Sequence, residues 1–510
     1  MTNSNNKGLF GKLLAYVEKS GNALPQPVTL FFIFILIVLA ASFIAGISGF
    51  SAVHPATGEK ISAVNLLSKD GIQRILTDMI DVFVEFPPLG LVLVVMLGIG
   101  VADYSGLIRA MLKAFVSGVP KQLITVSLVL AGMMSSLAAD AGYVVLIPLG
   151  AVIFYGIGRH PIAGLAAAFA GVSGGFSANL VLTSLDPLLA GFTQSAAQLE
   201  NIDYIVDPTA NWYLMAAMVP VFALAGTLVT EKIVIKHLGE YDRSQADVDE
   251  NDSKPLVRRE KIGLIGAFAS TIVLLGLFAW MTIPENGILR DINNENTFRP
   301  FFDAIVVLML ILFFVPGLVY GLIVKSIKGE KDVSDMMTKS MEGMGAYIVL
   351  AFVAAQFVAY FNWSNLGIIV AIKGAGFLQS IDFTGIPLML SFIIIASIIN
   401  IFIGSASAKW AIMAPVFVPM FMLMGYSPEL TQAAYRMGDS YSNILTPLLP
   451  YFPLIIIFAQ KYDKNIGIGT IISTMIPYSI AFAISSMIML MIWMYFEIPL
   501  GPGAPLYYIP

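Results

Sequence analysis

Long runs of apolar residues dominate the sequence and decide what the chain can fold into. A helix that crosses the hydrocarbon core of a bilayer needs about 20 mostly apolar residues. Clear runs of this length lie near residues 27–49, 87–108, 211–236, 262–283, 300–324, 344–380 and 467–497. Only 12% of the 510 residues are charged, against about 25% in ordinary soluble domains. The sequence therefore predicts an all-α polytopic membrane protein.

Lysine and arginine gather in segments that we expect on the cytoplasmic side, because cytoplasmic loops of membrane proteins carry an excess of these residues. These segments are 1–26, 109–121, 237–261 and 325–343. Segments 50–86 and 284–299 carry fewer positive charges and several acids, so we expect them outside. The N-terminus is then cytoplasmic, and the first apolar run is long enough to be kept as a spanning helix.

Four other apolar stretches are interrupted by polar, glycine and proline residues. Basic residues at both ends of 122–157 place both ends inside, so this stretch enters the membrane and returns as a re-entrant hairpin. By the same logic 386–424 is a hairpin that opens outward, whereas 161–199 and 430–459 each cross once as broken helices. The prediction is nine transmembrane helices plus two opposed re-entrant hairpins.

An internal repeat relates the two hairpin regions, and it appears when Pro148 is aligned with Pro415. The alignment pairs Asp140 with Ser407, Tyr143 with Trp410, and 174–179 with 438–443. Each half then has a hairpin followed by a broken helix, in opposite orientation. Unwound backbone inside a membrane is tolerated only against protein or a water-filled cavity. The inverted repeat therefore predicts a binding site at mid-membrane, as in secondary transporters.

This repeat divides the chain into five parts. A cytoplasmic segment, 1–26, precedes spans 1–2 in 27–121. Hairpin 1 and broken span 3 occupy 122–210, which is the first half of the predicted transport core. Spans 4–7 follow in 211–385, with cytoplasmic loops 237–261 and 325–343. The second half of the core, in 386–510, contains hairpin 2, broken span 8 and span 9.

Four ionisable residues lie deep in predicted membrane segments, where a charge is costly and suggests a function. They are Asp140, Asp186, Arg436 and Asp439. Arg436 and Asp439 lie three residues apart on one helix, so they can pair, and the alternative to a transport role is a structural ion pair. For Asp186, which precedes Pro187, and for Asp140, the alternative is a helix cap.

Neutral polar and aromatic residues beside these charges are further candidates. Ser407 lies in a small-residue stretch that also suits close helix packing. Trp410 lies near a hairpin tip, where it can stack on a substrate, although an interfacial position is the alternative. Asn400 is either a ligand or a helix–helix hydrogen bonder. Asn179 and Asn443, at the two breaks, offer amide oxygens to a cation.

Other classes of protein have little support in the sequence. There is no cysteine, and the histidines are scattered at His54, His160 and His237. Metalloprotease, nucleophile-elbow and P-loop motifs are absent, and no basic stripe suggests nucleic acid. An intramembrane aspartyl protease also uses two acids, but the sequences around Asp186 and Asp439 lack the expected motifs. A passive channel is the other alternative, and the re-entrant hairpins favour alternating access over it.

At these residues the sequence resembles the AbgT, or p-aminobenzoyl-glutamate transporter, family. The motifs that carry the resemblance are Gly158-Arg-His-Pro-Ile-Ala-Gly164, Gly174-Gly-Phe-Ser-Ala-Asn179, Asn286-Gly-Ile-Leu-Arg-Asp291, Phe361-Asn-Trp-Ser-Asn365, Gly404-Ser-Ala-Ser-Ala-Lys-Trp410, Tyr435-Arg-Met-Gly-Asp-Ser440 and Gly501-Pro-Gly-Ala-Pro505. The resemblance implies a homodimer in the bacterial inner membrane, with nine spans, two opposed hairpins and a likeness to the dicarboxylate/sodium symporter fold.

The resemblance also implies roles for single residues. Those that match the family's substrate path are Asp186, Ser407, Trp410, Arg436, Asp439 and Pro447. Asn400 and Asp439 match a sodium site, and carboxylate and amide oxygens suit a hard cation. Arg436 suits a substrate carboxylate. Because Asp439 cannot neutralise Arg436 fully and also bind sodium, we expect it to exchange partners between states.

The sequence thus predicts a secondary transporter with no cofactor. The expected substrates are p-aminobenzoyl-glutamate and related aminobenzoate or sulfonamide-like compounds, moved by uptake or by efflux. The coupling ion is sodium or a proton. Because more of the charged and aromatic candidates lie in the second half, we expect selectivity mainly from that half, with Asp186 as the main contribution of the first.

Overall fold

The structure is a computed structural model, and it describes residues 27–509 except 56–57, 118, 139–141, 243–255, 292–297, 448 and 450. Within these residues, eight helical segments are long and apolar enough to cross a membrane. The predicted all-α membrane protein is therefore confirmed. The predicted cytoplasmic segment 1–26, most of the loop 237–261 and the candidate Asp140 lie outside the described residues.

Seven of the eight long helical segments overlap the long apolar runs, and the eighth, Gly385–Phe402, lies at the start of the interrupted stretch 386–424. They are α2 (Pro27–Ser48), α3 (Lys69–Val84) followed by α4 (Pro87–Tyr104), α10 (Trp212–Val229) followed by η5 (Thr230–Val234) and α11 (Ile235–Leu238), α12 (Arg258–Thr282), α14 (Ile305–Val324), α16 (Gly345–Trp363), α18 (Gly385–Phe402) and α22 (Ile468–Tyr495). One predicted run was wrong. The stretch 344–380 is two helices, α16 and α17 (Leu366–Ser380), because Asn365 adopts a left-handed conformation with φ of 58°.

The four interrupted stretches are broken in the structure as predicted. The first contains η1 (Lys121–Leu123), α6 (Ile124–Met134), η2 (Ser135–Ala138), η3 (Gly142–Leu146) and α7 (Ile147–Gly156). The second contains α8 (Pro161–Phe169), η4 (Ala170–Gly174) and α9 (Leu185–Ala197). In the second half, the non-helical residues 403–405 separate α18 from α19 (Ala406–Met422), and α20 (Pro428–Ser442), η8 (Asn443–Leu445) and α21 (Phe452–Gln460) follow.

Helix α20 shows why these residues form separate helices. Gly425, with φ of 87°, turns the chain after α19. Ser427 then caps α20 by accepting a hydrogen bond from the Leu430 amide, and Pro428 occupies the first helical position, where its missing N–H costs nothing. Every residue of α20 is buried, although the helix carries glutamate, arginine and aspartate side chains. A buried helix of this polarity needs partners for its side chains.

The remaining elements lie around this core. Segment 50–86 contains a small antiparallel sheet of β1 (Ser51–Val53) and β2 (Lys60–Ser62), with Ala52 opposite Ile61, and the amphipathic α3. The shorter helices are α5 (Leu107–Ser117), α13 (Arg299–Asp303) and the amphipathic α15 (Glu330–Gly343).

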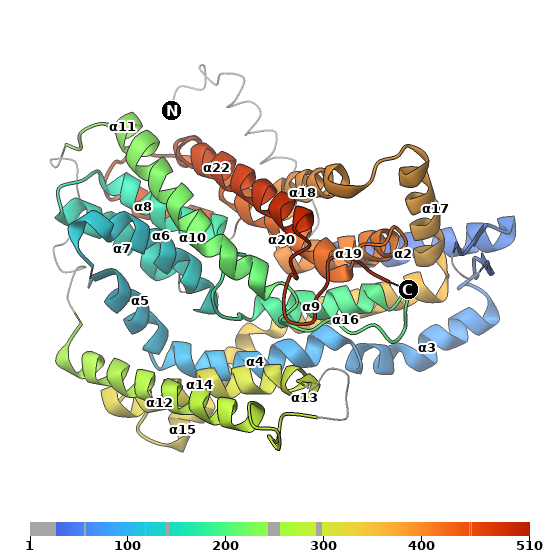
Figure 1. Cartoon of the computed structure of the whole chain (residues 1–510), viewed down its shortest axis with the longest axis horizontal. Helices are drawn as coiled ribbons and strands as arrows, with labels where there is room; N and C mark the ends of the chain where they lie inside the picture. Colours follow the sequence, from blue (N-terminus) through green and yellow to red (C-terminus); the bar gives the residue numbers. More distant parts are fainter. Residues whose placement is uncertain are drawn as a thin grey trace.

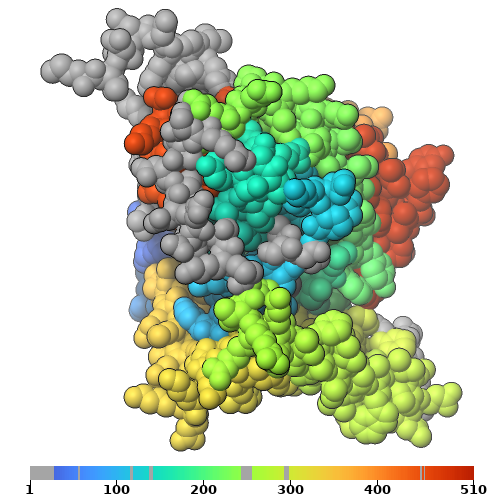
Figure 2. Space-filling model, turned by 90° about the vertical axis from the view of Figure 1, so that its left-hand side faces the viewer, coloured from blue at the N-terminus to red at the C-terminus, as the bar shows by residue number. Residues whose placement is uncertain are grey.

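Figure 1 shows how the helices are arranged. Helices α9, α19 and α20 lie near the middle, while α12, α13, α14 and α15 lie along one edge of the molecule. Helix α4 packs against both α14 and α9, so it joins this edge to the middle. In the view turned by 90°, the edge appears as the lime and yellow layer below the teal and green segments (Figure 2). The hairpin and broken-helix regions of both halves thus share one core.

The C-terminal segment closes one end of this core. Tyr508 donates its backbone N–H to Gly425 O at 2.9 Å, and the Ser427 N–H donates to Leu506 O at 3.0 Å. The Tyr213 N–H donates to Leu500 O at 2.9 Å. The end of the chain is therefore tied both to the turn before α20 and to the start of α10.

The loop between α9 and α10 lies at the same end and holds a half-buried acid, Asp207. Burial raises the pKa of the Asp207 carboxyl above its ordinary value, and Asp303 raises it further, while Arg299 acts in the opposite direction. Arg299 itself pairs with Asp303, with 2.9 Å between Nε and Oδ1. The carboxyl of Asp207 is thus less stable in its charged form than it is in water.

The closest helix contacts predict where added side chains are not tolerated. A Cβ at Gly98 of α4 would lie 2.4 Å from the backbone oxygen of Leu310 on α14. Gly98→Ala should therefore lower the free energy of unfolding by about 1–3 kcal/mol through overpacking. Gly276 of α12 has no atom within 4 Å of its added Cβ, so Gly276→Ala is the matched control and should not destabilise. Thermal unfolding in detergent measures both, and equal melting temperatures would contradict the predicted contact.

Asp207 predicts a pH dependence of stability. Since its pKa is raised by folding, the folded state binds the proton more tightly, and stability falls as the pH rises from the unfolded pKa through the folded pKa. Asp207→Asn should therefore raise the melting temperature at neutral pH, and the gain should vanish below the pKa of the unfolded chain. The exposed Asp203 provides the control Asp203→Asn. A pH-independent gain would contradict this origin.

Candidate functional site

The breaks of the two halves meet in the core. The Ser440 hydroxyl of α20 donates to the Gly174 carbonyl at 2.8 Å and accepts from the Ser177 N–H at 3.1 Å. Gly174 ends η4, and Ser177 belongs to the non-helical stretch before α9. A single side chain from the second half thus satisfies two backbone groups that the unwinding of the first half leaves open. The breaks in the two predicted halves are therefore in direct contact.

Arg436 and Asp186 form a buried ion pair between the halves. Nη1 of Arg436 lies 2.6 Å from Oδ1 of Asp186, and both side chains are almost fully buried. The second oxygen of Asp186 accepts hydrogen bonds from the Thr183 N–H and hydroxyl at 2.6 and 2.9 Å. Asp186 therefore orders the turn that leads into α9 and also pairs with Arg436.

Arg436 keeps donor atoms free in this arrangement. Its Nε and Nη2 are buried and have no hydrogen-bond partner among the described residues. Polar atoms of the first-half break are in the same condition, and they are the hydroxyls of Ser173 and Ser177 and Oδ1 of Asn179. Buried polar groups normally find partners, so a set of such groups where the two breaks meet points to a polar ligand.

Asp439 has a different partner from the predicted one. Its Oδ1 accepts from the ammonium group of Lys409, in the first part of α19, and both side chains are buried. The predicted pair of Arg436 with Asp439 was wrong, because Arg436 is taken by Asp186. The expected exchange of Asp439 between Arg436 and sodium loses its basis with that pair. Sequence reasoning also missed Lys409 as a deep charge, although it lies in the quoted 404–410 motif.

Asn400 of α18 completes this second cluster. Its amide nitrogen lies 2.8 Å from the Asp439 carbonyl, 2.7 Å from the Ser442 hydroxyl and 2.9 Å from Oδ1 of Asn443. Those acceptors orient the amide so that its oxygen points to Lys409, which donates to it. Asn443 in turn donates to Oδ2 of Asp439 at 3.4 Å. Asn400 thus has two roles. It forms hydrogen bonds between α18 and α20, and its oxygen binds the Lys409 ammonium group.

The residues implied for sodium do not fit the ion in this arrangement. Asn400 and Asp439 do lie together, as the resemblance implied. However, Oδ1 of each residue accepts a hydrogen bond from the Lys409 ammonium group. The remaining carboxylate oxygen accepts from Asn443. A sodium ion needs several oxygen ligands at once, and the oxygens of this cluster already have hydrogen-bond donors.

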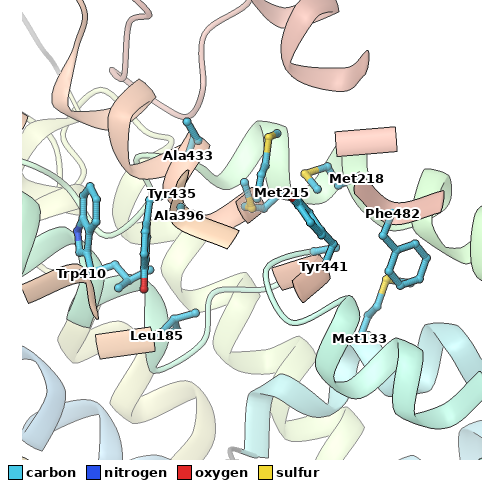
Figure 3. Close-up of a cluster of buried hydrophobic side chains, with 14 of the residues drawn as sticks. Met133, Leu185, Met215, Met218, Ala396, Trp410, Ala433, Tyr435, Tyr441 and Phe482 are labelled. Carbon is cyan, nitrogen blue, oxygen red and sulfur yellow. The ribbon is translucent and has the colours of Figure 1, made fainter. Parts of the chain in front are cut away.

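Trp410 is packed in the core and does not lie at a membrane interface. Its exposed fraction is 0%, which excludes the interfacial alternative. The indole stacks on the Tyr435 ring with centroids 4.4 Å apart, and its N–H donates to the Thr193 hydroxyl at 2.8 Å. Figure 3 shows the rings of Trp410 and Tyr435 side by side, with Leu185 nearby. One face of Trp410 is therefore occupied by the protein itself.

A chain of hydrogen bonds leads from Trp410 toward the C-terminal end of the molecule, and sequence reasoning missed it. Thr193 donates to Gln432 Oε1 at 2.5 Å, and Gln432 donates to Asn211 Oδ1 at 2.9 Å. Asn211 donates to the Glu429 carbonyl at 2.8 Å, and the carboxylate of Glu429 accepts from the Tyr204 hydroxyl at 2.9 Å. The polar residues of 428–442 in an otherwise apolar region are the sequence pattern that could have indicated this chain of hydrogen bonds.

Two of the other predicted residues, Ser407 and Asn179, make local hydrogen bonds. Ser407 is in the first turn of α19, 3.3 Å from the hydroxyl of the capping residue Ser405. Asn179 is buried and donates to the Phe176 carbonyl at 3.1 Å. Pro447 is half-buried in the turn between η8 and α21. The structure therefore brings predicted residues together in two clusters, one of Asp186 with Arg436 and one of Asn400 with Asp439 and Asn443.

Comparison with known proteins finds transporters that match nearly the whole chain. Residues 12–508 match the model of the AbgT putative transporter family. The p-aminobenzoyl-glutamate transport protein of Escherichia coli is 38% identical over 97% of this chain and 96% of its own length. The YdaH transporter of Alcanivorax borkumensis is 40% identical, over 94% of this chain and all of that one, with a TM-score of 0.89.

A second solved structure is also similar. Neisseria gonorrhoeae MtrF, which is described as illuminating a class of antimetabolite efflux pumps, is 48% identical over 97% of this chain and 100% of that one, with a TM-score of 0.91. The family match and these relatives are transporters and not enzymes. The chain therefore belongs to the AbgT family of membrane transporters.

Proposed function

We propose that this protein is a secondary transporter of p-aminobenzoyl-glutamate and related aminobenzoate or sulfonamide-like compounds. The observation that carries the proposal is the pair of free donors on buried Arg436, at the point where the two halves meet. A guanidinium group binds a carboxylate through two parallel N–H groups. The substrate class follows from this chemistry together with the relative that transports p-aminobenzoyl-glutamate.

Each part of such a substrate has a counterpart in the core. A carboxylate of the substrate binds Nε and Nη2 of Arg436, which Asp186 leaves free. Polar groups of the substrate meet the hydroxyl of Ser177 and the amide oxygen of Asn179. Its aromatic ring packs beside Trp410 and Tyr435, since aromatic pairs add to the energy of burial.

The full burial of this region fits alternating access better than a passive channel. Arg436 and Asp439 are each only 1% exposed, so the substrate reaches them when one half moves against the other. The corresponding topology is nine transmembrane helices plus two opposed hairpins, with the dicarboxylate/sodium symporter fold as its analogue. The N-terminus is cytoplasmic, and the protein is a homodimer in the bacterial inner membrane.

A cation gradient, of sodium or of protons, supplies the energy for transport in this proposal. The buried ion pairs support coupling, because a cation that changes their balance of charge also changes which conformation is stable. The direction is uptake or efflux. The name of the Escherichia coli relative states transport without a direction, whereas MtrF is described as illuminating a class of antimetabolite efflux pumps.

Arg436 provides a test of substrate recognition. In Arg436→Lys a single ammonium group replaces the guanidinium group, so it can still pair with Asp186 but cannot offer a substrate carboxylate two parallel N–H groups. Loss of one charged hydrogen bond costs about 1.5–3 kcal/mol, so the affinity for p-aminobenzoyl-glutamate should fall about tenfold or more. Titration calorimetry in detergent measures it.

The matched control is Arg159→Lys. Arg159 also pairs with a carboxylate, that of Glu231, and donates to Thr125 at 3.1 Å, away from the two breaks. This variant should bind the substrate as the wild type does. Wild-type affinity in Arg436→Lys would remove Arg436 from the proposed substrate site.

Coupled transport is tested in proteoliposomes with labelled p-aminobenzoyl-glutamate. An imposed sodium or proton gradient should drive accumulation above the equilibrium concentration, because a secondary transporter converts one gradient into another. Asp439→Asn should abolish this accumulation, since it removes the carboxylate from a buried ion pair.

The control for that variant is Asp382→Asn. Asp382 is exposed and has φ of 54°, a conformation that asparagine also adopts. Its accumulation should equal that of the wild type. If neither gradient drives accumulation in the wild type, the proposed coupling is wrong.

A further inference from the structure

The ammonium group of Lys409 is held as a free cation would be held. It is bound by the amide oxygen of Asn400 on α18 and by a carboxylate oxygen of Asp439 on α20. Lys409, Asn400 and Asp439 are between 0% and 1% exposed. A charge this deep is retained only with partners. The two oxygens come from two helices other than the one that carries Lys409.

The surroundings fix these oxygens in place. The Asn400 amide nitrogen donates to three acceptors. They are the Asp439 carbonyl oxygen, the Ser442 hydroxyl and Oδ1 of Asn443. The same Asn443 side chain donates to the other oxygen of Asp439. Oxygen ligands that are oriented before the cation arrives are characteristic of cation sites in proteins.

We propose that Lys409 takes the place of a bound sodium ion between α18, α19 and α20, so that the wild-type protein binds no sodium at Asn400 and Asp439. The single negative charge of Asp439 is already balanced by the ammonium group. A sodium ion beside it would add an uncompensated buried charge, which is strongly unfavourable. The cation of this site is covalently attached to the transporter.

The position of Lys409 links this cation to the proposed substrate site. Trp410 is the next residue, and it packs on Tyr435 and donates to Thr193 of α9. Arg436 follows Tyr435 and binds Asp186 of the same α9. Withdrawal of the ammonium group from Asp439 therefore moves the α19 segment that carries Trp410. This link rests on the proposed transport function, whereas the sodium-binding claim does not.

Removal of the ammonium group should create a sodium site. In Lys409→Ala the oxygens of Asn400 and Asp439 lose their cation and gain space for a sodium ion with water. Purified protein in detergent is compared in NaCl and in N-methyl-D-glucamine chloride at equal ionic strength. The melting temperature of Lys409→Ala should rise by several degrees in NaCl, since a ligand that binds the folded state stabilises it, whereas the wild type should show no difference.

Two further variants act as controls for folding and for charge. Lys409→Met removes the charge but fills the space, so it should show a much smaller response to sodium than Lys409→Ala. The double variant Lys409→Ala with Asp439→Asn has no buried charge left at the site, so it should fold and show no response. Equilibrium dialysis with radioactive sodium should find saturable binding in Lys409→Ala alone.

The outcomes separate this proposal from the proposed function. Saturable sodium binding by the wild type that Asp439→Asn abolishes would overturn the proposal, because sodium would then displace the ammonium group. Absence of sodium binding in both the wild type and Lys409→Ala would also overturn it, since the oxygens would not form a cation site. Substrate binding takes no part in these measurements, so a failure to transport aminobenzoates leaves their result unchanged.

Discussion

Two ion pairs that diverge from one turn of a buried helix hold the core together. Arg436 and Asp439 lie three residues apart on α20, and each binds an opposite charge from another element, Asp186 of α9 and Lys409 of α19. Loss of one partner from a buried pair costs about 3–5 kcal/mol, because the remaining charge stays buried without compensation. The helices that carry these partners are therefore restricted to positions that bring their charges to α20.

The polar character of α20 follows from this arrangement. A helix inside a membrane protein is normally apolar, but α20 has a charged or hydroxyl side chain at almost every turn and is buried throughout. Ser440 bonds the break of the first half, and Gln432 continues the chain of hydrogen bonds from Trp410. The helix thus serves as the common partner of the other broken elements, and the apolar helices around it separate it from lipid.

Much of the fold, and several of the buried charges, could be predicted from the free-energy cost of polar groups in lipid. That principle identified most of the long helices, the four interrupted stretches, and Asp186, Arg436 and Asp439 as charges buried in the core. It could not assign partners. The spacing rule for helices pairs Arg436 with Asp439, whereas the fold brings each of them a partner from a distant part of the sequence. Tertiary contacts between residues 250 positions apart, as for Arg436 and Asp186, leave no local pattern.

The errors have related causes. Lys409 directly follows a run of small residues at a predicted hairpin tip, and nothing in that run indicates that its side chain is buried against α18 and α20. Glu429 and Tyr204 lie at the ends of predicted segments, where charge and hydroxyl groups are common and need no special partner. The division of 344–380 depends on the backbone conformation of Asn365 alone, and hydropathy carries no signal for that.

The hydrogen bonds of the C-terminal segment have a consequence for biosynthesis. Residues Leu500, Leu506 and Tyr508 join the start of α10 to the turn that precedes α20. These residues are synthesised after all the helices that they connect. The core can therefore close only once residues 500–508 have been made, and until then Arg436 and Asp439 lie in an incompletely enclosed core. Insertion and final assembly are thus separate stages in the life of this protein.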